Sequence, residues 1–296
     1  MKVILSRKGF DSSWGGFPSI ILPKEMGRKM ISFPIPVTSP EIGIKAEDIY
    51  YVEAGKTLKD FFNELPIEQE KKYINNKTGF HVDPEVQNIK IDNQKSFIER
   101  GYGTLGQCSA AAGHLANNGI SAGGISEKDP AIFLFFGWFC KTEIENDKIK
   151  YIGNPLVDGF HAIWGYLIAV EAIEILDISK HPELKEHLHY RNKNHKEYKK
   201  GDKNTIFIGN KFGTFNYSDN LRLTYFDDKK TKNRRTIWAI PSFISEMTYN
   251  NKRIKEGKTK GNKLIIDAAS RGQEFVITKA DEEEMKKWLD NLGVNF

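Results

Sequence analysis

Cysteine is almost missing from this chain of 296 residues, where only Cys108 and Cys140 occur. Two thiols can build neither a disulfide framework nor a four-thiolate zinc site, and such usage is typical of a reducing compartment. Long apolar runs are missing as well. The apolar stretch after Lys2 is too short for an export signal, and the longest uncharged segment, residues 101–126, is rich in glycine and polar side chains. We therefore expect a cytoplasmic protein with no membrane partner.

The sequence also lacks internal repeats and low-complexity tracts, and its glycine-rich opening stretch, residues 6–19, contains neither a Walker motif nor the spaced-glycine dinucleotide fingerprint. The absence of repeats excludes solenoids and propellers. What is present is a composition that can fold: 39% of the residues are hydrophobic and 12% are aromatic. We expect one domain over residues 1–296.

The formal net charge is only +5, but basic residues are concentrated in the second half of the chain. They form clusters at Arg191 to Lys200, at Lys229 to Arg235 and at Lys252 to Lys263. Such patches suit a polyanion, and they equally suit solvated loops, so both interpretations stay open. The sequence predicts that residues 178–203 form a basic surface insertion.

Strand and helix signals do not alternate regularly, which predicts an α+β fold rather than a doubly wound or α/β-barrel architecture. We expect a mixed, mainly antiparallel sheet or a partly open barrel, with a few packing helices. The predicted strands are rich in β-branched or aromatic residues and lie at 3–6, 132–139, 162–170, 205–208, 222–225, 236–240 and 274–277. The predicted helices lie at 56–63, 107–118 and 281–292.

The first candidate site is the glycine-rich stretch of residues 6–19, which follows the first predicted strand. Small residues let backbone amides approach an anion, and charged neighbours could hold it or orient a ligand group. A tight glycine turn that only secures the strand end is the competing interpretation. The candidate ligand-binding and catalytic residues of this stretch are Arg7, Lys8, Asp11, Ser12, Gly15 and Gly16.

The second candidate is the sequence His81-Val82-Asp83-Pro84, which places an imidazole and a carboxylate on one side of an extended segment. The pair could bind a metal ion, or act as a base and the group that orients it. A histidine that is merely hydrogen-bonded in a turn is an equal alternative.

A third segment, residues 101–115, places a glycine-rich turn before a helix of small side chains. Gln107 and His114 are seven residues apart and would share one face of that helix. A phosphate or a flipped base could bind at its N-terminal end, whereas close packing against a sheet would explain the same residues. Near the carboxyl end, Arg271, Gln273 and Glu274 could read a base edge or hold a phosphate, or could form a buried ion pair.

Residues 128–175 contain a buried apolar strand, a polar excursion and a second strand broken by Gly165. This order of features loosely resembles the PUA-like barrels, a group that includes the EVE and ASCH modules. That resemblance implies RNA or modified bases as ligands. Trp138, His161 and Trp164 could stack on a base, and burial in the core is the alternative.

Five motifs together resemble the nucleotide modification associated domain family, third type, over nearly the whole chain. They are Ser-Arg-Lys-Gly-Phe-Asp-Ser-Ser-Trp-Gly-Gly-Phe-Pro-Ser at 6–19, His-Val-Asp-Pro at 81–84, Gly106 to His114, Phe-Phe-Gly-Trp-Phe at 135–139 and Arg-Gly-Gln-Glu-Phe-Val at 271–276. The resemblance implies association with DNA-base modification in bacteria and their viruses, and it names no reaction. The residues it implies as shared are Arg7, Asp11, Gly15, Gly16, His81, Asp83, Gln107, His114, Arg271, Gln273 and Glu274.

The leading hypothesis is therefore a protein that binds a nucleotide or a DNA base in one cleft built from these distant segments. If it is an enzyme, Asp11 or Asp83 would act as base and His81 or His114 as acid or orienting group, with arginines holding phosphate. A scaffold that binds other proteins of a modification system is the third hypothesis. The sequence specifies neither a cofactor nor a metal ion.

Overall fold

The computed structural model describes residues 1–10, 15–37, 43–65, 78–92, 94–194, 203–227, 234–254, 257–268 and 273–294. The α-helices are α1 (Leu58–Glu64), α2 (Ser109–Asn117), α3 (Pro155–Asp158), α4 (Leu188–Arg191) and α5 (Glu282–Leu292). The strands are β1 (Lys2–Arg7), β2 (Ser19–Ile21), β3 (Met30–Ile31), β4 (Ile35–Val37), β5 (Ile49–Tyr51), β6 (Lys56–Thr57), β7 (Gly79–His81), β8 (Ile89–Ile91), β9 (Gly103–Cys108), β10 (Ala131–Glu145), β11 (Lys148–Tyr151), β12 (Phe160–Ala169), β13 (Glu171–Glu174), β14 (Asn204–Gly209), β15 (Lys211–Thr214), β16 (Ile237–Pro241), β17 (Ile244–Tyr249), β18 (Lys252–Arg253), β19 (Lys258–Lys260), β20 (Lys263–Asp267) and β21 (Glu274–Ala280).

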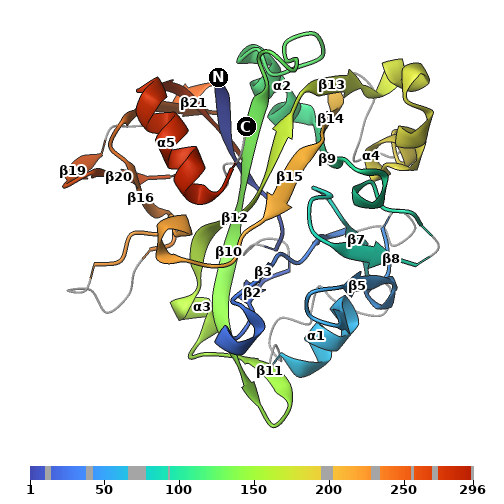
Figure 1. Cartoon of the computed structure of the whole chain (residues 1–296), viewed down its shortest axis with the longest axis vertical. Helices are drawn as coiled ribbons and strands as arrows, with labels where there is room; N and C mark the ends of the chain where they lie inside the picture. The colour runs from blue at the N-terminus through green and yellow to red at the C-terminus, as the bar shows by residue number, and fades with distance from the viewer. Residues whose placement is uncertain are drawn as a thin grey trace.

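A large mixed sheet forms the centre of the molecule, with the strand order β15-β12-β10-β1-β21-β17-β18 (Figure 1). Strands β1 and β2 run parallel to β10, and the other pairings in this sheet are antiparallel. The first ten residues of β10 are all buried, because both faces of this central strand are covered. The α+β class and the mainly antiparallel sheet expected from the sequence are confirmed.

Smaller sheets flank the central one, with strand orders β13-β14-β9, β16-β20-β19, β6-β5-β8 and β4-β7. In Figure 1, β16, β19, β20 and α5 lie on one side of the long central strands, and β5, β7, β8 and α1 lie on the other. None of the described strands closes into a barrel. The PUA-like element stays a prediction. Among the described helices, none has the length and apolar character needed to cross a membrane.

Most of the predicted elements are present at nearly the expected bounds. The last helix begins after Asp281, whose side chain accepts a hydrogen bond from the Glu284 amide, and it ends at Gly293 in the left-handed conformation. Residues 222–225, in contrast, form only isolated bridges to Ala162 and Trp238, so the strand predicted there is wrong. The helix predicted from residue 107 begins at Ser109 instead, because residues 103–108 pair with β14 as strand β9.

The segment predicted as a surface insertion, residues 178–203, is described except for residues 195–202. Two short 3₁₀-helices, Ile175–Lys180 and Pro182–Glu186, lead into α4. Leu184 packs in a hydrophobic cluster with Phe97, and Leu188 packs in a second cluster. These buried leucines hold the start of α4 against the body of the protein.

Candidate functional site

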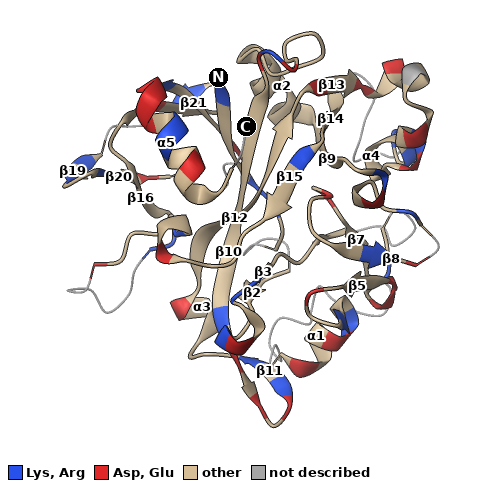
Figure 2. Ribbon diagram, viewed as in Figure 1, with Lys and Arg blue, Asp and Glu red and all other residues tan. Residues whose placement is uncertain are grey.

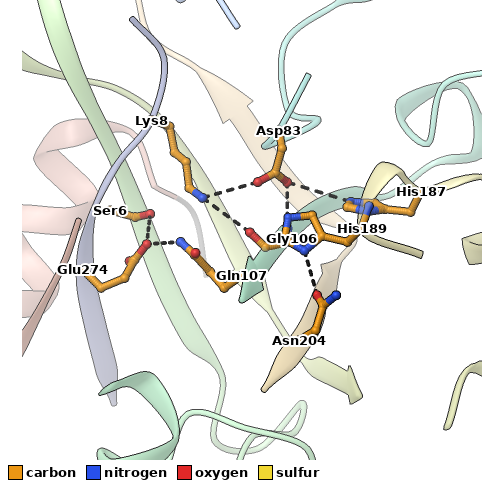
Figure 3. Close-up of polar contacts among 9 residues, drawn as sticks. All are labelled: Ser6, Lys8, Asp83, Gly106, Gln107, His187, His189, Asn204 and Glu274. Atoms are coloured by element: carbon orange, nitrogen blue, oxygen red, sulfur yellow. Dashed lines mark hydrogen bonds and ion pairs between the residues drawn. The ribbon is translucent and has the colours of Figure 1, made fainter. Parts of the chain in front are cut away.

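Polar side chains from six separate parts of the chain meet at the junction of the central sheet with the β13-β14-β9 sheet. Figure 3 shows most of them, from β1, β9, β14, β21, the start of α4 and the turn after β7. Eight members are buried, and His81 is the one with partial exposure. We call this group the polar cluster, and its members are Ser6, Lys8, His81, Asp83, Gln107, His187, His189, Asn204 and Glu274.

Asp83 is the centre of the polar cluster. Its Oδ2 lies 3.3 Å from Lys8 Nζ, and its Oδ1 accepts a hydrogen bond of 2.7 Å from the Gly106 amide. Burial opposes ionisation of this carboxyl group, but Lys8 and the three neighbouring histidines together outweigh burial and hold the pKa of Asp83 at about 2. Asp83 is therefore a buried carboxylate at neutral pH.

Three histidines surround Asp83. His187 Nε2 lies 3.9 Å from Asp83 Oδ1, and the ring of His189 lies 5.2 Å from that of His81, centroid to centroid. Burial lowers the pKa of His81 and of His187 to about 3, against the pull of the Asp83 charge. Burial also lowers the pKa of His189. The three imidazoles are thus neutral near pH 7, and each has one nitrogen with a proton and one with a lone pair.

Glu274, the first residue of β21, occupies the other end of the polar cluster. Its Oε1 accepts hydrogen bonds from Ser6 Oγ, at 2.9 Å, and from Gln107 Nε2. Its Oε2 is buried and has no hydrogen-bond partner among the described residues. Burial raises the pKa of Glu274 to about 8, although Lys8 and the Ser6 hydroxyl favour the ionised form. Near pH 7 the cluster therefore holds a protonated carboxyl group with one unused oxygen.

The structure brings together five of the residues that the sequence predicted as site residues: Lys8, His81, Asp83, Gln107 and Glu274. Asp11, Ser12 and Arg271 lie outside the described residues. The roles assigned to all of these side chains stay predictions.

Other predicted site residues lie elsewhere in the structure. The guanidinium of Arg7 lies 5.6 Å from the ring centroid of Phe136, because alternate residues of β1 point to opposite faces of the sheet. The Gln273 side chain is exposed, and its backbone carbonyl accepts a hydrogen bond from the Arg7 amide. A Cβ added to Gly15 would overlap the ring of Phe10, so this glycine serves packing of the aromatic cluster. Gly16 is likewise buried.

His114 does not share a face with Gln107, which corrects the expectation of a common helix. Gln107 belongs to β9, whereas His114 belongs to α2. The ring of His114 accepts a hydrogen bond from the Asn251 amide through Nδ1, and its Nε2 lies 3.2 Å from the Thr248 carbonyl oxygen. It therefore ties α2 to the turn between β17 and β18.

Sequence reasoning missed the contribution of His187, His189 and Asn204. The basic residues around them led us to interpret the segment as a solvated surface. The signal in the sequence was the alternation His187-Leu188-His189, which has the same spacing as His81-Val82-Asp83. Nothing in the sequence, however, tells which distant segment meets the His-x-Asp turn.

A basic groove of about 830 Å³ lies between the β16-β20-β19 sheet and the β17-β18 hairpin. Figure 2 shows basic residues at the β19 end of this sheet. Arg234 pairs with Asp267, and Lys260 donates to the Tyr225 hydroxyl. The charged residues that line the groove are Asp227, Arg234, Lys252, Arg253, Lys258, Lys260 and Asp267.

Comparison with known protein families identifies the family of the chain. The family described as nucleotide modification associated domain 3 matches residues 2–278, nearly the whole chain. The chain belongs to this family. The match includes every segment that contributes to the polar cluster, and the family is described as associated with nucleotide modification. No curated protein and no solved structure matches the chain.

Proposed function

We propose that this nucleotide modification associated domain 3 protein binds a nucleotide or a DNA base at the polar cluster. The observation that carries the proposal is the unused Oε2 of Glu274, a buried polar atom without a hydrogen-bond partner among the described residues. Buried polar atoms in proteins are nearly always hydrogen-bonded, so a ligand is expected to complete this one. As a protonated carboxyl group, Glu274 donates a hydrogen bond to a ring nitrogen or to a carbonyl oxygen of a base.

The neighbours of Glu274 suit the same ligand. The ammonium group of Lys8 lies close enough to oppose the raised pKa of Glu274, and it can attract a phosphate. Gln107 offers a carbonyl oxygen as acceptor, since its amide nitrogen is engaged by Glu274. The basic groove provides a surface for the phosphates of DNA, which makes DNA or its nucleotides the partner class of this proposal.

A second candidate function is an enzyme that modifies the bound base or nucleotide by acid–base chemistry. The specific observation is the split between two carboxyl groups of one cluster, with a pKa of about 2 for Asp83 and about 8 for Glu274. Environments that drive two carboxyl pKa values apart create a base and an acid that coexist at neutral pH. Asp83, ionised at neutral pH, would accept a proton from the reacting base or nucleotide, and Glu274, protonated at neutral pH, would donate a proton to it. Nucleoside mass spectrometry of DNA from cells with and without the protein would reveal the product.

Calorimetric titration with nucleoside monophosphates and a short duplex at pH 7 and at pH 9 tests the binding proposal. The wild-type affinity should fall at pH 9, because the carboxyl group of Glu274 ionises and no longer donates a hydrogen bond. The Glu274→Gln variant should bind equally at both pH values, because its amide donates at either pH.

Glu246→Gln is the matched control. Glu246 lies on the neighbouring strand β17, pairs with Arg253 and is not part of the polar cluster. This variant should keep the wild-type loss of affinity at pH 9. The proposal is wrong if no nucleotide or duplex binds to the wild-type protein, or if Glu274→Gln keeps the wild-type pH dependence.

A further inference from the structure

Three ligand groups of the polar cluster converge around one point. One nitrogen each of His81 and His189 and one oxygen of Asp83 lie within 4.8 Å of one another. Ligand atoms bound to a common transition-metal ion at about 2.1 Å stand about 3 to 4 Å apart. Side-chain adjustments of about 1 Å, within rotamer wells, would therefore close this triangle on an ion.

The tautomer of His189 agrees with metal coordination. His189 Nδ1 donates a hydrogen bond of 2.7 Å to Asn204 Oδ1, so Nε2 is the ring nitrogen that carries the lone pair. A Cβ added to Gly106 would overlap Cδ2 and Nε2 of the His189 ring. This edge of the ring therefore lies beside Gly106, whose backbone amide donates a hydrogen bond to Asp83. Metal-bound histidines usually donate the second ring N–H to an acceptor in this way.

The third histidine has the opposite tautomer. His187 Nδ1 accepts a hydrogen bond from the His189 amide at the start of α4. Its proton is therefore on Nε2, the atom that lies 3.9 Å from Asp83 Oδ1. At that distance His187 makes no hydrogen bond to the carboxylate, and because its Nε2 carries the proton it offers no lone pair to an ion beside Asp83. The hydrogen bonds of the two rings therefore give His187 and His189 different roles.

We propose that His81, Asp83 and His189 bind one divalent transition-metal ion and leave coordination positions open for a ligand. Two imidazoles and one carboxylate suit first-row transition ions such as Fe²⁺, Co²⁺ or Zn²⁺, whereas Mg²⁺ and Ca²⁺ prefer all-oxygen sites. The metal site itself does not depend on the proposed function. Only the position of a bound nucleotide beside the ion rests on that proposal. Lys8 remains on Asp83 Oδ2, the oxygen turned away from His187 (Figure 3).

The test is a titration of the full-length, chelator-treated protein with Co²⁺, followed by visible absorption. We expect one equivalent to bind, with the spectrum of a site that has nitrogen ligands. His189→Ala and Asp83→Asn should each remove this absorption. His181→Ala is the matched control, because His181 is a partly exposed histidine that contacts Glu171 and Glu183 outside the polar cluster.

Asn204 provides a variant pair that leaves all three ligands intact. Asn204→Ala should weaken Co²⁺ binding about 10- to 100-fold, because His189 loses the acceptor that fixes its tautomer. Asn204→Asp keeps an acceptor and should restore tight binding, which loss of structure alone would not explain.

The metal proposal is overturned if the wild-type protein binds no stoichiometric Co²⁺, or if His181→Ala removes the absorption while Asn204→Ala leaves it unchanged. Nucleotide titration of the chelator-treated protein separates the two proposals. Nucleotide binding without Co²⁺ binding would overturn only the metal site, whereas Co²⁺ binding without nucleotide binding would overturn only the proposed function.

Discussion

At the scale of single residues, the buried ion pair of Lys8 and Asp83 distinguishes the polar cluster from an ordinary core. Each charge of this pair costs several kcal/mol to remove from water, and each is compensated chiefly by the other. Lys8 also approaches the Gly106 carbonyl oxygen, at 3.5 Å, so its ammonium group has two acceptors. Removing one member of the pair therefore costs more stability than the pair itself contributes, because the other charge is left buried without a partner.

Lys8→Met should lower the free energy of unfolding by about 3 to 5 kcal/mol, because Asp83 would be left as a buried charge without a cation. Urea unfolding in the presence of a chelator measures the loss. The double variant Lys8→Met/Asp83→Asn should recover most of it, since no buried charge remains. A double variant as unstable as the single one would contradict this account.

The pH dependence of stability should reveal Glu274. Its pKa is about 8 in the folded protein and near the ordinary 4.5 in the unfolded chain, so between these values the folded state holds a proton that the unfolded state has released. The contribution of Glu274 to stability is therefore complete below pH 4.5 and declines as the pH rises to 8. Glu274→Gln should show a smaller decline between pH 5 and pH 8 in urea unfolding. Equal declines in the variant and the wild-type protein would exclude the raised pKa.

At the scale of elements, the sequence predicts long, strongly patterned segments well and their partners poorly. The apolar run of β10 and the capped helix α5 could be recognised because their signals are local. The last two residues of β9, Gln107 and Cys108, were predicted as the start of a helix, because they precede an alanine-rich segment and the pairing of β9 with β14 is not a local property. The convergence of His81 and Asp83 with His189 depends on that same long-range pairing.

The packing of α4 on β9 yields a test with a matched pair of glycines. Gly106→Ala should destabilise the protein by about 1 to 3 kcal/mol, because the new methyl group would overlap the ring of His189. Gly113→Ala, in α2, meets open space and should raise stability by about 0.5 to 1 kcal/mol through helix propensity. Thermal and urea unfolding of the two variants measure both effects. Equal effects of both substitutions would show that α4 does not pack on β9 as described.

At the scale of the whole molecule, a buried polar cluster and a basic surface groove accompany the central sheet. The polar cluster lies where this sheet meets the β13-β14-β9 sheet, and the basic groove lies beside the β17-β18 hairpin. Composition located the basic groove approximately, since residues 252–263 were recognised as a basic cluster. It could not show that these lysines line a groove, because that depends on how β19 and β20 fold back against β16.

If the basic groove binds DNA phosphates, affinity for a duplex should fall with salt. Replacing Lys252, Lys258 and Lys260 by alanine should reduce the slope of log affinity against log salt by about 0.9 for each phosphate that the protein no longer neutralises. Alanine at Lys211, Lys286 and Lys287 changes the net charge equally but lies outside the groove, and it should change the slope less. Fluorescence anisotropy over a range of salt concentrations measures both. Equal slopes for the two triple variants would indicate that the groove is not the DNA surface.

The most direct test of the central claim, that the polar cluster is the ligand site of this family member, compares two glutamines. Gln107 is buried in the polar cluster, whereas the side chain of Gln273 is exposed one residue before Glu274. Calorimetric titration with nucleoside monophosphates should show a loss of about tenfold or more for Gln107→Leu and almost none for Gln273→Leu. Equal losses, or a loss confined to Gln273→Leu, would contradict the account.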